Sequence, residues 1–222
     1  MSSDSPFWRL NEDGNVSSIS IVGYKPSWGS SKPESYFEIA SLKTVLVHHY
    51  QKEWFRITED LKWQRLKGLP DSVKILVTFD VKDHGTLLGT TDGVYYIDRS
   101  YEVKKFEGHN SISEINLFEK SVNPKVILAG GFEGLYAIDL DEFKIHPYQE
   151  SVYELIGAIK WISPEFGGRV IIRASNGDFL IDKDDEVKEI TNLADFYRIQ
   201  VFEDIGKAYA FKRENYESMI YE

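Results

Sequence analysis

Acidic side chains are the residues of this sequence whose types and positions come nearest to a catalytic pattern. Four of them stand close to the start of a strand-like apolar run: Asp71, Glu114, Glu154 and Asp195. Hydrolysis of a glycosidic bond needs two such carboxyl groups, one to protonate the leaving group and one to act as base or nucleophile. Because the chain has 36 acidic residues, four at these positions are expected by chance. We therefore assign no catalytic residue and keep a carbohydrate-active protein, a glycosidase or a lectin, as the alternative function.

Metal-binding and cofactor patterns are weak. His48 and His49 are adjacent, and neighbouring residues of a strand point to opposite faces, so the pair is poorly placed to hold one ion. The acidic run of residues 182–186 lacks the glycine and the distal glutamate of a calcium loop, and other copies of the repeat described below have a turn at this place. Phosphate-loop, dinucleotide and GxSxG motifs are absent from the sequence. We predict no metal, no cofactor and a function that is not enzymatic.

Composition limits the partners of the chain. The sequence has 222 residues, a net charge of −10 and no cysteine. A nucleic-acid partner and an anionic membrane surface both require a basic face, so neither is expected. No apolar run reaches membrane-spanning length, and the N-terminus lacks the pattern of a signal peptide. We expect a cytoplasmic protein without membrane insertion, or an extracytoplasmic one if the chain is a domain of a longer secreted protein.

Any functional site of this chain would be positioned by strands that repeat along the sequence. Residues 85–106 read as a strand, the turn Thr91-Asp92-Gly93, a second strand, another turn and a third strand, because an Asp-Gly pair between apolar runs favours a hairpin. The pattern returns in residues 125–148 and 169–190, with its glycine 41 and then a further 43 residues later. All three copies continue to an Ile-Asp pair, at Asp98, Asp139 and Asp182. A more divergent copy, residues 44–66, has Glu53 in place of the glycine.

The repeat predicts a β-propeller. Each copy follows a further strand-like run, in residues 36–40, 73–79, 112–118 and 152–162, although residues 154–161 could also form a helical turn. Four strands in a period of about 40 residues are typical of a propeller blade. The middle runs of each copy do not alternate between apolar and polar residues, as expected for strands covered on both faces by neighbouring blades.

We predict one all-β domain over residues 1–222, a five-bladed β-propeller of four-stranded antiparallel blades. Four blades cover about residues 34–67, 72–107, 111–149 and 151–191, and the closing blade combines residues 5–22 with residues 195–222. A ring closed by strands from both termini leaves no open sheet edge. If residues 216–222 form a strand, the closing blade divides into three strands and one.

The segments LLGTTDGVYYID, ILAGGFEGLYAID and IIRASNGDFLID resemble the propeller repeat of the two-component-regulator type. The sequence departs from that repeat because Leu87 and Ile127 stand where the family has tryptophan in the first hairpin strand. It also lacks the further blades and the signalling domain of the family. The resemblance implies a sensory or protein-interaction module and supplies no catalytic residue.

In a propeller, the turns between the second and third strands lie on the same face as the connections between blades. We expect a ligand to bind there, on residues Tyr50, Asp92, His109, Phe132, Glu133, Tyr148 and Asn176. Aromatic rings among amides and acids suit a protein or peptide ligand, and a carbohydrate is possible, because the rings give contact area at low entropic cost. The alternative is that these are only the residues that the turns require. The sequence therefore predicts a non-enzymatic binding or scaffolding module.

Overall fold

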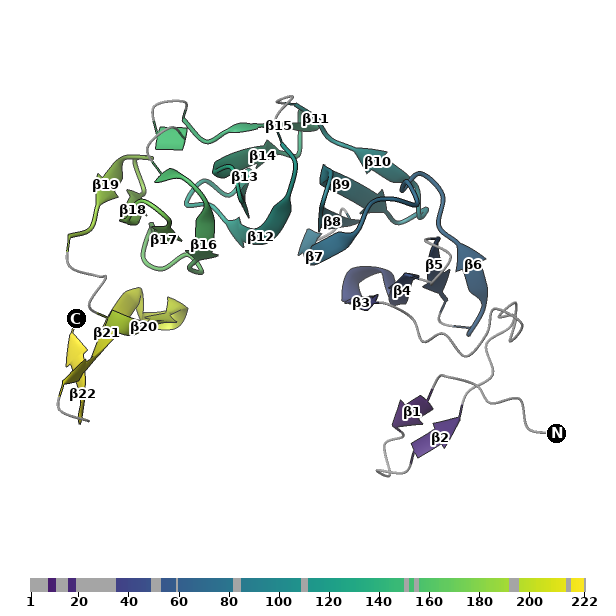
Figure 1. The fold of residues 1–222 in the computed structure, drawn as a ribbon, viewed down its shortest axis with the longest axis horizontal. Coiled ribbons are helices and arrows are strands. Elements are labelled where there is room, and N and C mark those ends of the chain that lie inside the picture. The colour runs from purple at the N-terminus through teal and green to yellow at the C-terminus, as the bar shows by residue number, and fades with distance from the viewer. Residues whose placement is uncertain are drawn as a thin grey trace. The chain divides into compact units, whose positions relative to one another are not determined.

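The computed structural model describes residues 8–10, 16–18, 35–48, 53–58, 60–81, 85–108, 112–149, 152–153, 156–191, 196–214 and 217–221. Two compact units divide the chain. Unit 1 comprises residues 1–73, 80–88 and 95–104, and unit 2 comprises residues 74–79, 89–94 and 105–222. β-Strands make up most of both units (Figure 1). None of the helices in the described part of the chain is long and apolar enough to cross a membrane.

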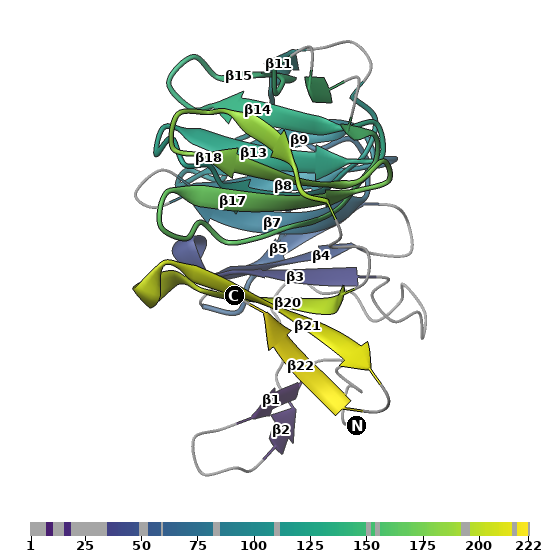
Figure 2. The ribbon, with the colours of Figure 1, turned by 90° about the vertical axis from the view of Figure 1, so that its left-hand side faces the viewer.

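Four sheets repeat the arrangement of four antiparallel strands in chain order. The first has the order β3-β4-β5-β6, formed by Ser35–Ile39, Thr44–His48, Trp54–Ile57 and Trp63–Arg65. The second has the order β10-β9-β8-β7, with β7 Ile75–Val81, β8 Gly85–Thr90, β9 Gly93–Asp98 and β10 Val103–Lys105. In the third, β12 Ile115–Lys120, β13 Val126–Gly131, β14 Leu135–Asp139 and β15 Lys144–Pro147 are neighbours in this order. The fourth contains β16 Ile159–Ile162, β17 Arg169–Ala174, β18 Asp178–Asp182 and β19 Val187–Glu189, with β17 beside β18 in Figure 2. The expected four-stranded antiparallel unit is thus present.

A fifth strand adds to the third sheet. β11, Glu107–Gly108, pairs in parallel with β15, so that Glu107 lies opposite Lys144 and Gly108 opposite Ile145. The approach is close, because a Cβ atom added to Gly108 would lie 2.1 Å from the carbonyl oxygen of Ile145. The segment that leaves the second sheet therefore covers the outer edge of the third, which the repeat did not predict.

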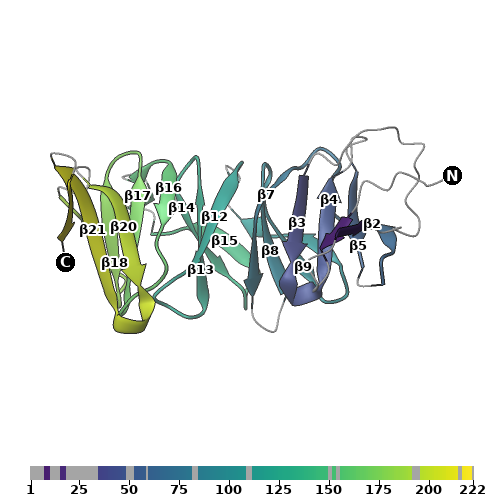
Figure 3. The ribbon, with the colours of Figure 1, turned by 90° about the horizontal axis from the view of Figure 1, so that it is seen from below.

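The two ends of the chain form smaller sheets. β1 Trp8–Leu10 pairs with β2 Val16–Ser18, and β20 Phe196–Phe202, β21 Lys207–Glu214 and β22 Glu217–Tyr221 form a three-stranded sheet. A short 3₁₀ helix, η4 Glu203–Ile205, joins β20 to β21 at the bottom of Figure 3. The last residues thus add a strand, as one version of the prediction required. Since β1–β2 and β20–β22 belong to different sheets in the described residues, the closed ring of five blades stays a prediction.

The middle strands are buried on both faces. All six residues of β8 are buried, and Leu87 and Leu88, which point to opposite faces, have no exposed surface. The outer strands differ, because two of the three residues of β10 are exposed. Burial on both faces explains why the middle runs do not alternate, and confirms that expectation.

The repeated aspartate anchors the turn between the third and fourth strands. Asp98 Oδ1 accepts hydrogen bonds from the backbone N–H of Ser100 at 2.8 Å and of Glu102 at 3.0 Å. Asp139 accepts bonds from the backbone N–H groups of Asp141 and Glu142, and Asp182 accepts them from those of Asp184 and Glu186. In the first sheet, the hydroxyl of Thr58 accepts the bond from Lys62 N–H. Each of these turns contains a residue with positive φ: Leu61, Tyr101, Phe143 or Asp185.

The strand expected over residues 152–162 is shorter than predicted. Val152, Tyr153 and Ile156 are helical, and β16 begins only at Ile159. The N–H groups of Val152 and Tyr153 both donate to the carbonyl oxygen of Gln149, at 2.9 and 3.0 Å. A local helical turn therefore replaces the first part of the strand, close to the alternative that the sequence left open.

Candidate functional site

Three turns of unit 2 join the second strand of a sheet to the third, and they contain most of the predicted ligand-binding residues. They are residues 91–92 between β8 and β9, residues 132–134 between β13 and β14, and residues 175–177 between β17 and β18. We call these turns, with the segments that lead into the following sheets, the turn surface. Gly93, Gly134 and Gly177 have φ values of +88°, +155° and +153°, which glycine adopts readily.

Hydrogen bonds connect the turns to neighbouring segments. Gly93 N–H donates to the carbonyl oxygen of Ser113 at 2.9 Å, and the Ser113 hydroxyl donates to Glu133 Oε1 at 2.9 Å. Asn176 N–H donates to the carbonyl oxygen of Ile156 at 3.3 Å. These bonds link the turns at residues 91–92 and 132–134 through Ser113, so this part of the turn surface is held by contacts from both sides.

Glu133 is the centre of a polar network. Besides the two bonds from Ser113, its Oε2 accepts a bond from the hydroxyl of Tyr136 at 3.3 Å. The oxygens of Tyr136 and Tyr153 are 3.0 Å apart. Since the single proton of Tyr136 is donated to Glu133, Tyr153 must donate to Tyr136. Burial, and then the bond with Tyr153, raise the pKa of Tyr136 far above its usual value, so its hydroxyl remains a donor.

Phe132 is an exposed aromatic residue next to this network. Its side chain precedes Glu133 in the turn and is 76% exposed. On the other side of Glu133, a Cβ atom added to Gly134 would lie 2.5 Å from the ring of Tyr153, so the backbone packs tightly against that ring. An exposed aromatic side chain thus stands on a turn whose neighbours are fixed by packing and hydrogen bonds.

The other predicted residues are placed differently. Asp92 forms an ion pair with Lys105 at 2.8 Å, and Asn176 is exposed beside Ser175. Tyr148 was expected on the surface but is buried, with 6% of its area exposed, and its hydroxyl donates to Asp185 at 2.9 Å. Burial and this bond raise the pKa of Tyr148 strongly. Tyr50 and His109 lie outside the described residues.

The residues weighed for catalysis or metal binding have other contacts. Arg65 Nη2 lies 3.3 Å from a carboxylate oxygen of Asp71. His48 is buried and stacks on Trp54 with ring centres 4.6 Å apart, so it belongs to the core. Asp182 anchors a turn and pairs with Lys188 at 3.0 Å, which lowers its pKa. Glu114 is exposed, whereas His49, Glu154 and Asp195 lie outside the described residues.

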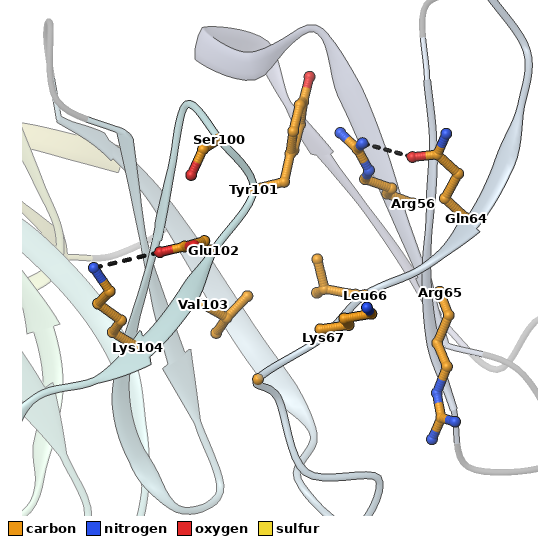
Figure 4. A pocket seen from close by; sticks show the side chains of 11 residues that line it. Arg56, Gln64, Arg65, Leu66, Lys67, Ser100, Tyr101, Glu102, Val103 and Lys104 are labelled. Atoms are coloured by element: carbon orange, nitrogen blue, oxygen red, sulfur yellow. Dashed lines mark hydrogen bonds and ion pairs between the residues drawn. The ribbon is translucent and has the colours of Figure 1, made fainter.

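A pocket in unit 1 was not predicted. It has a volume of about 400 Å³. One side is formed by β6 and the residues after it, and the other side by the turn that joins β9 to β10 (Figure 4). We call it the Tyr101 pocket. Its lining residues are Arg56, Gln64, Arg65, Leu66, Lys67, Gly68, Ser100, Tyr101, Glu102, Val103 and Lys104. A local repeat pattern could not reveal it, because its two walls come from different sheets.

No family model matches the chain, and no curated protein matches it. Solved structures do. The extracellular domain of a hybrid two-component system of B. thetaiotaomicron, BT3049, is 9% identical with a TM-score of 0.54 over 84% of this chain. A streptogramin B lyase is 11% identical, with a TM-score of 0.57 over 96% of this chain and 74% of its own. PorZ, a surface component of the type-IX secretion system of Porphyromonas gingivalis, is 13% identical, with a TM-score of 0.56 over 86% of this chain.

At these identities the likeness concerns the fold alone. The chain spans 28% of the length of the B. thetaiotaomicron domain and 28% of PorZ. Together with the four-stranded antiparallel sheets, these neighbours show a propeller-like all-β fold.

Proposed function

We propose that the chain is a non-enzymatic binding module that takes a protein or peptide ligand on the turn surface. The observation that carries the proposal is Phe132, which is 76% exposed next to the fixed carboxylate of Glu133. Burying an aromatic side chain of this size contributes about 1.5–3 kcal/mol to binding. A ring held on a rigid turn loses little entropy when it is covered.

The polar groups around Phe132 suit a peptide. Glu133 already accepts bonds from Ser113 and Tyr136, so its position is fixed before a ligand arrives. Asp92 and Asn176 offer a carboxylate and an amide on the neighbouring turns, and both groups can bond to peptide N–H groups. None of these residues has the partner arrangement of an activated nucleophile or acid–base pair, which favours binding over catalysis.

The structural neighbours support an extracytoplasmic sensor or interaction module over the cytoplasmic location that we expected. Two further structures among them are extracellular domains of one- and two-component systems of B. thetaiotaomicron, at TM-scores of 0.53. We further propose that the sheets form a five-bladed ring closed by both ends of the chain. The C-terminal sheet has three strands, and the N-terminal segment can supply a fourth. Deletion of residues 1–20 should then unfold or oligomerise the protein, and a stable truncated monomer would exclude the ring.

Peptide selection with a matched control tests the binding proposal. A phage-displayed dodecapeptide library is selected on the wild-type protein, and the recovered peptides are titrated against Phe132→Ser and Tyr36→Ser. Both side chains are 76% exposed, but Tyr36 lies on β3 and away from the turn surface in sequence. We expect the Phe132 variant to bind about tenfold or more weakly, which corresponds to about 1.4 kcal/mol, and the Tyr36 variant to bind normally.

Two results would count against this function. If the selected peptides bind Phe132→Ser as tightly as the wild type, the turn surface is not the site. If an array of soluble sugars stabilises the protein against heat, and replacement of Glu114 abolishes turnover of one of them, the carbohydrate-active alternative replaces the binding module.

A further inference from the structure

The Tyr101 pocket has a cationic lining in an acidic protein. Four of its lining residues are cationic, Arg56, Arg65, Lys67 and Lys104, whereas Glu102 is the single acidic one. The whole chain, by contrast, has a net charge of −10. Cations collected around a concave surface create a local positive potential that attracts anions.

Two of the four cations already have counter-ions. Arg65 Nη2 lies 3.3 Å from Glu53 and 3.3 Å from Asp71, and in Figure 4 its side chain points away from Arg56. Lys104 Nζ lies 3.6 Å from Glu102. Within the described part of the chain, no carboxylate lies within ion-pair distance of Arg56 or Lys67. These two cations therefore give the pocket its unneutralised charge.

Arg56 is held in place without being neutralised. Its guanidinium lies over the ring of Tyr101, with Cζ 3.4 Å from the ring centre, and its Nη2 donates to the neutral amide oxygen of Gln64 at 2.5 Å (Figure 4). The hydroxyl of Tyr101 donates to the carbonyl oxygen of Leu42 at 3.0 Å, which fixes the ring. Arg56 Nη1 is buried and has no hydrogen-bond partner among the described residues. A half-buried guanidinium without a counter-ion is costly, and the charge of an anion in the pocket would offset that cost.

The other walls are apolar and closely packed. Leu66 and Val103 are buried, with 4% and 9% of their area exposed, and lie between the charged groups in Figure 4. Gly68, at φ +89°, comes so near the opposite wall that an added Cβ atom would lie 2.5 Å from the carbonyl oxygen of Val103. Apolar groups therefore bring the two walls of the pocket close together at Gly68 and Val103.

We propose that the Tyr101 pocket binds a singly charged carboxylate joined to an apolar or aromatic group. The planar fork of an arginine matches a carboxylate in geometry, and Lys67 supplies a second positive charge. A phosphate with two charges fits less well, because Glu53, Asp71 and Glu102 neutralise Arg65 and Lys104 and leave two cations unpaired among the described residues. The volume of about 400 Å³ falls within the range of small-ligand pockets and admits one such group. A peptide C-terminus and a free small acid share this chemistry.

The test uses matched acids and amides on the full chain. The probes are 3-phenylpropionate and its neutral amide, a short peptide ending in phenylalanine as free acid and as amide, and inorganic phosphate. Binding is followed by NMR chemical-shift titration at low salt. We expect each acid to bind at least about tenfold more tightly than its amide, and more weakly when salt is raised. If only the small acid binds, the ligand is a free metabolite, whereas peptide-acid binding assigns a chain terminus.

Charge-removing variants locate the site. Lys67→Gln and Arg56→Gln should each weaken acid binding about fivefold to tenfold, whereas Lys144→Gln, which removes an exposed cation paired with Glu142, should not. Lys67 is exposed, so its variant is expected to fold even if Arg56→Gln does not. Phe132→Ser should leave acid binding intact, which separates this site from the turn surface. Equal binding of acids and amides, tighter binding of phosphate, or the same loss in the Lys67 and Lys144 variants would overturn the proposal.

Discussion

Replacement of Asp98 by alanine tests whether the repeated aspartate is an anchor of the turn. Its Oδ1 accepts bonds from Ser100 N–H at 2.8 Å, from the Ser100 hydroxyl at 2.6 Å and from Glu102 N–H at 3.0 Å. The alanine variant loses all three. Because this turn is in contact with water, the freed donors can be solvated, and each bond is worth only its net value of about 0.5–1.5 kcal/mol. We therefore expect the free energy of unfolding to fall by about 1.5–4.5 kcal/mol, the sum over the three bonds.

Asp98→Asn is the matched control, because asparagine keeps an oxygen acceptor and loses the charge. Burial alone would raise the pKa of Asp98, but the bonds from the Ser100 hydroxyl and two backbone N–H groups outweigh it and lower the pKa below its ordinary value of 3.8. A lowered folded-state pKa stabilises the protein above pH 3.8, and this stability is lost as the pH falls through the folded value. The asparagine variant should lack this group's contribution to acid sensitivity and lose less stability than alanine at neutral pH.

Urea unfolding at neutral pH and near pH 3 measures both effects. The turn also holds Tyr101 at φ +65°, where its ring lies under Arg56, so Asp98→Ala should weaken carboxylate binding in the Tyr101 pocket as well. If the alanine variant stays within about 0.5 kcal/mol of the wild type, or if alanine and asparagine behave alike at both pH values, the aspartate does not anchor the turn through these bonds.

Two further changes test contacts between sheets. Gly108→Ala places a Cβ atom 2.1 Å from the carbonyl oxygen of Ile145, so β11 should separate from β15. Amide exchange of the β15 edge should then accelerate while β13 and β14 stay protected, and unchanged exchange at that edge would contradict the pairing. Trp54→Phe removes the bond from Nε1 to the buried carbonyl oxygen of Val73 at 2.8 Å and should cost about 1–3 kcal/mol in urea unfolding. Unaltered stability would show that water reaches Val73.

The features that the sequence predicts well are local ones. A turn that needs positive φ selects glycine at Gly93, Gly134 and Gly177, so one residue type marks the same place in three sheets. Burial on both faces excludes charged residues from β8, and this also shows in the sequence without knowledge of the fold. The repeated aspartate was visible as a pattern, but its role was not, because its partners are backbone N–H groups common to every sequence.

The features that the sequence did not predict depend on contacts between sheets. Tyr148 follows β15 in a connection that was expected to be exposed, yet its hydroxyl reaches Asp185 in the next sheet and its ring is buried. The pairing of β11 with β15 needs two short segments 37 residues apart that have no apolar pattern of their own. The Tyr101 pocket likewise requires residues 40 or so apart in sequence. No periodicity within one sheet can indicate such neighbours.

The residue with positive φ in each anchored turn shows how similar sheets acquire different surfaces. Phe143 stacks on Phe106 with ring centres 4.0 Å apart, so this turn contacts the segment after β10 through two apolar rings. Asp185 accepts a hydrogen bond from Tyr148, so this turn contacts the segment after β15 through polar groups. Tyr101 instead meets Arg56, a cation whose side chain lines the pocket. An aspartate anchors each of the three turns, although the turn after Asp139 has its residue with positive φ one position later than the other two. The chemistry of each contact is therefore decided by the residue with positive φ in the turn, and this residue is where a search for binding sites in related sheets should begin.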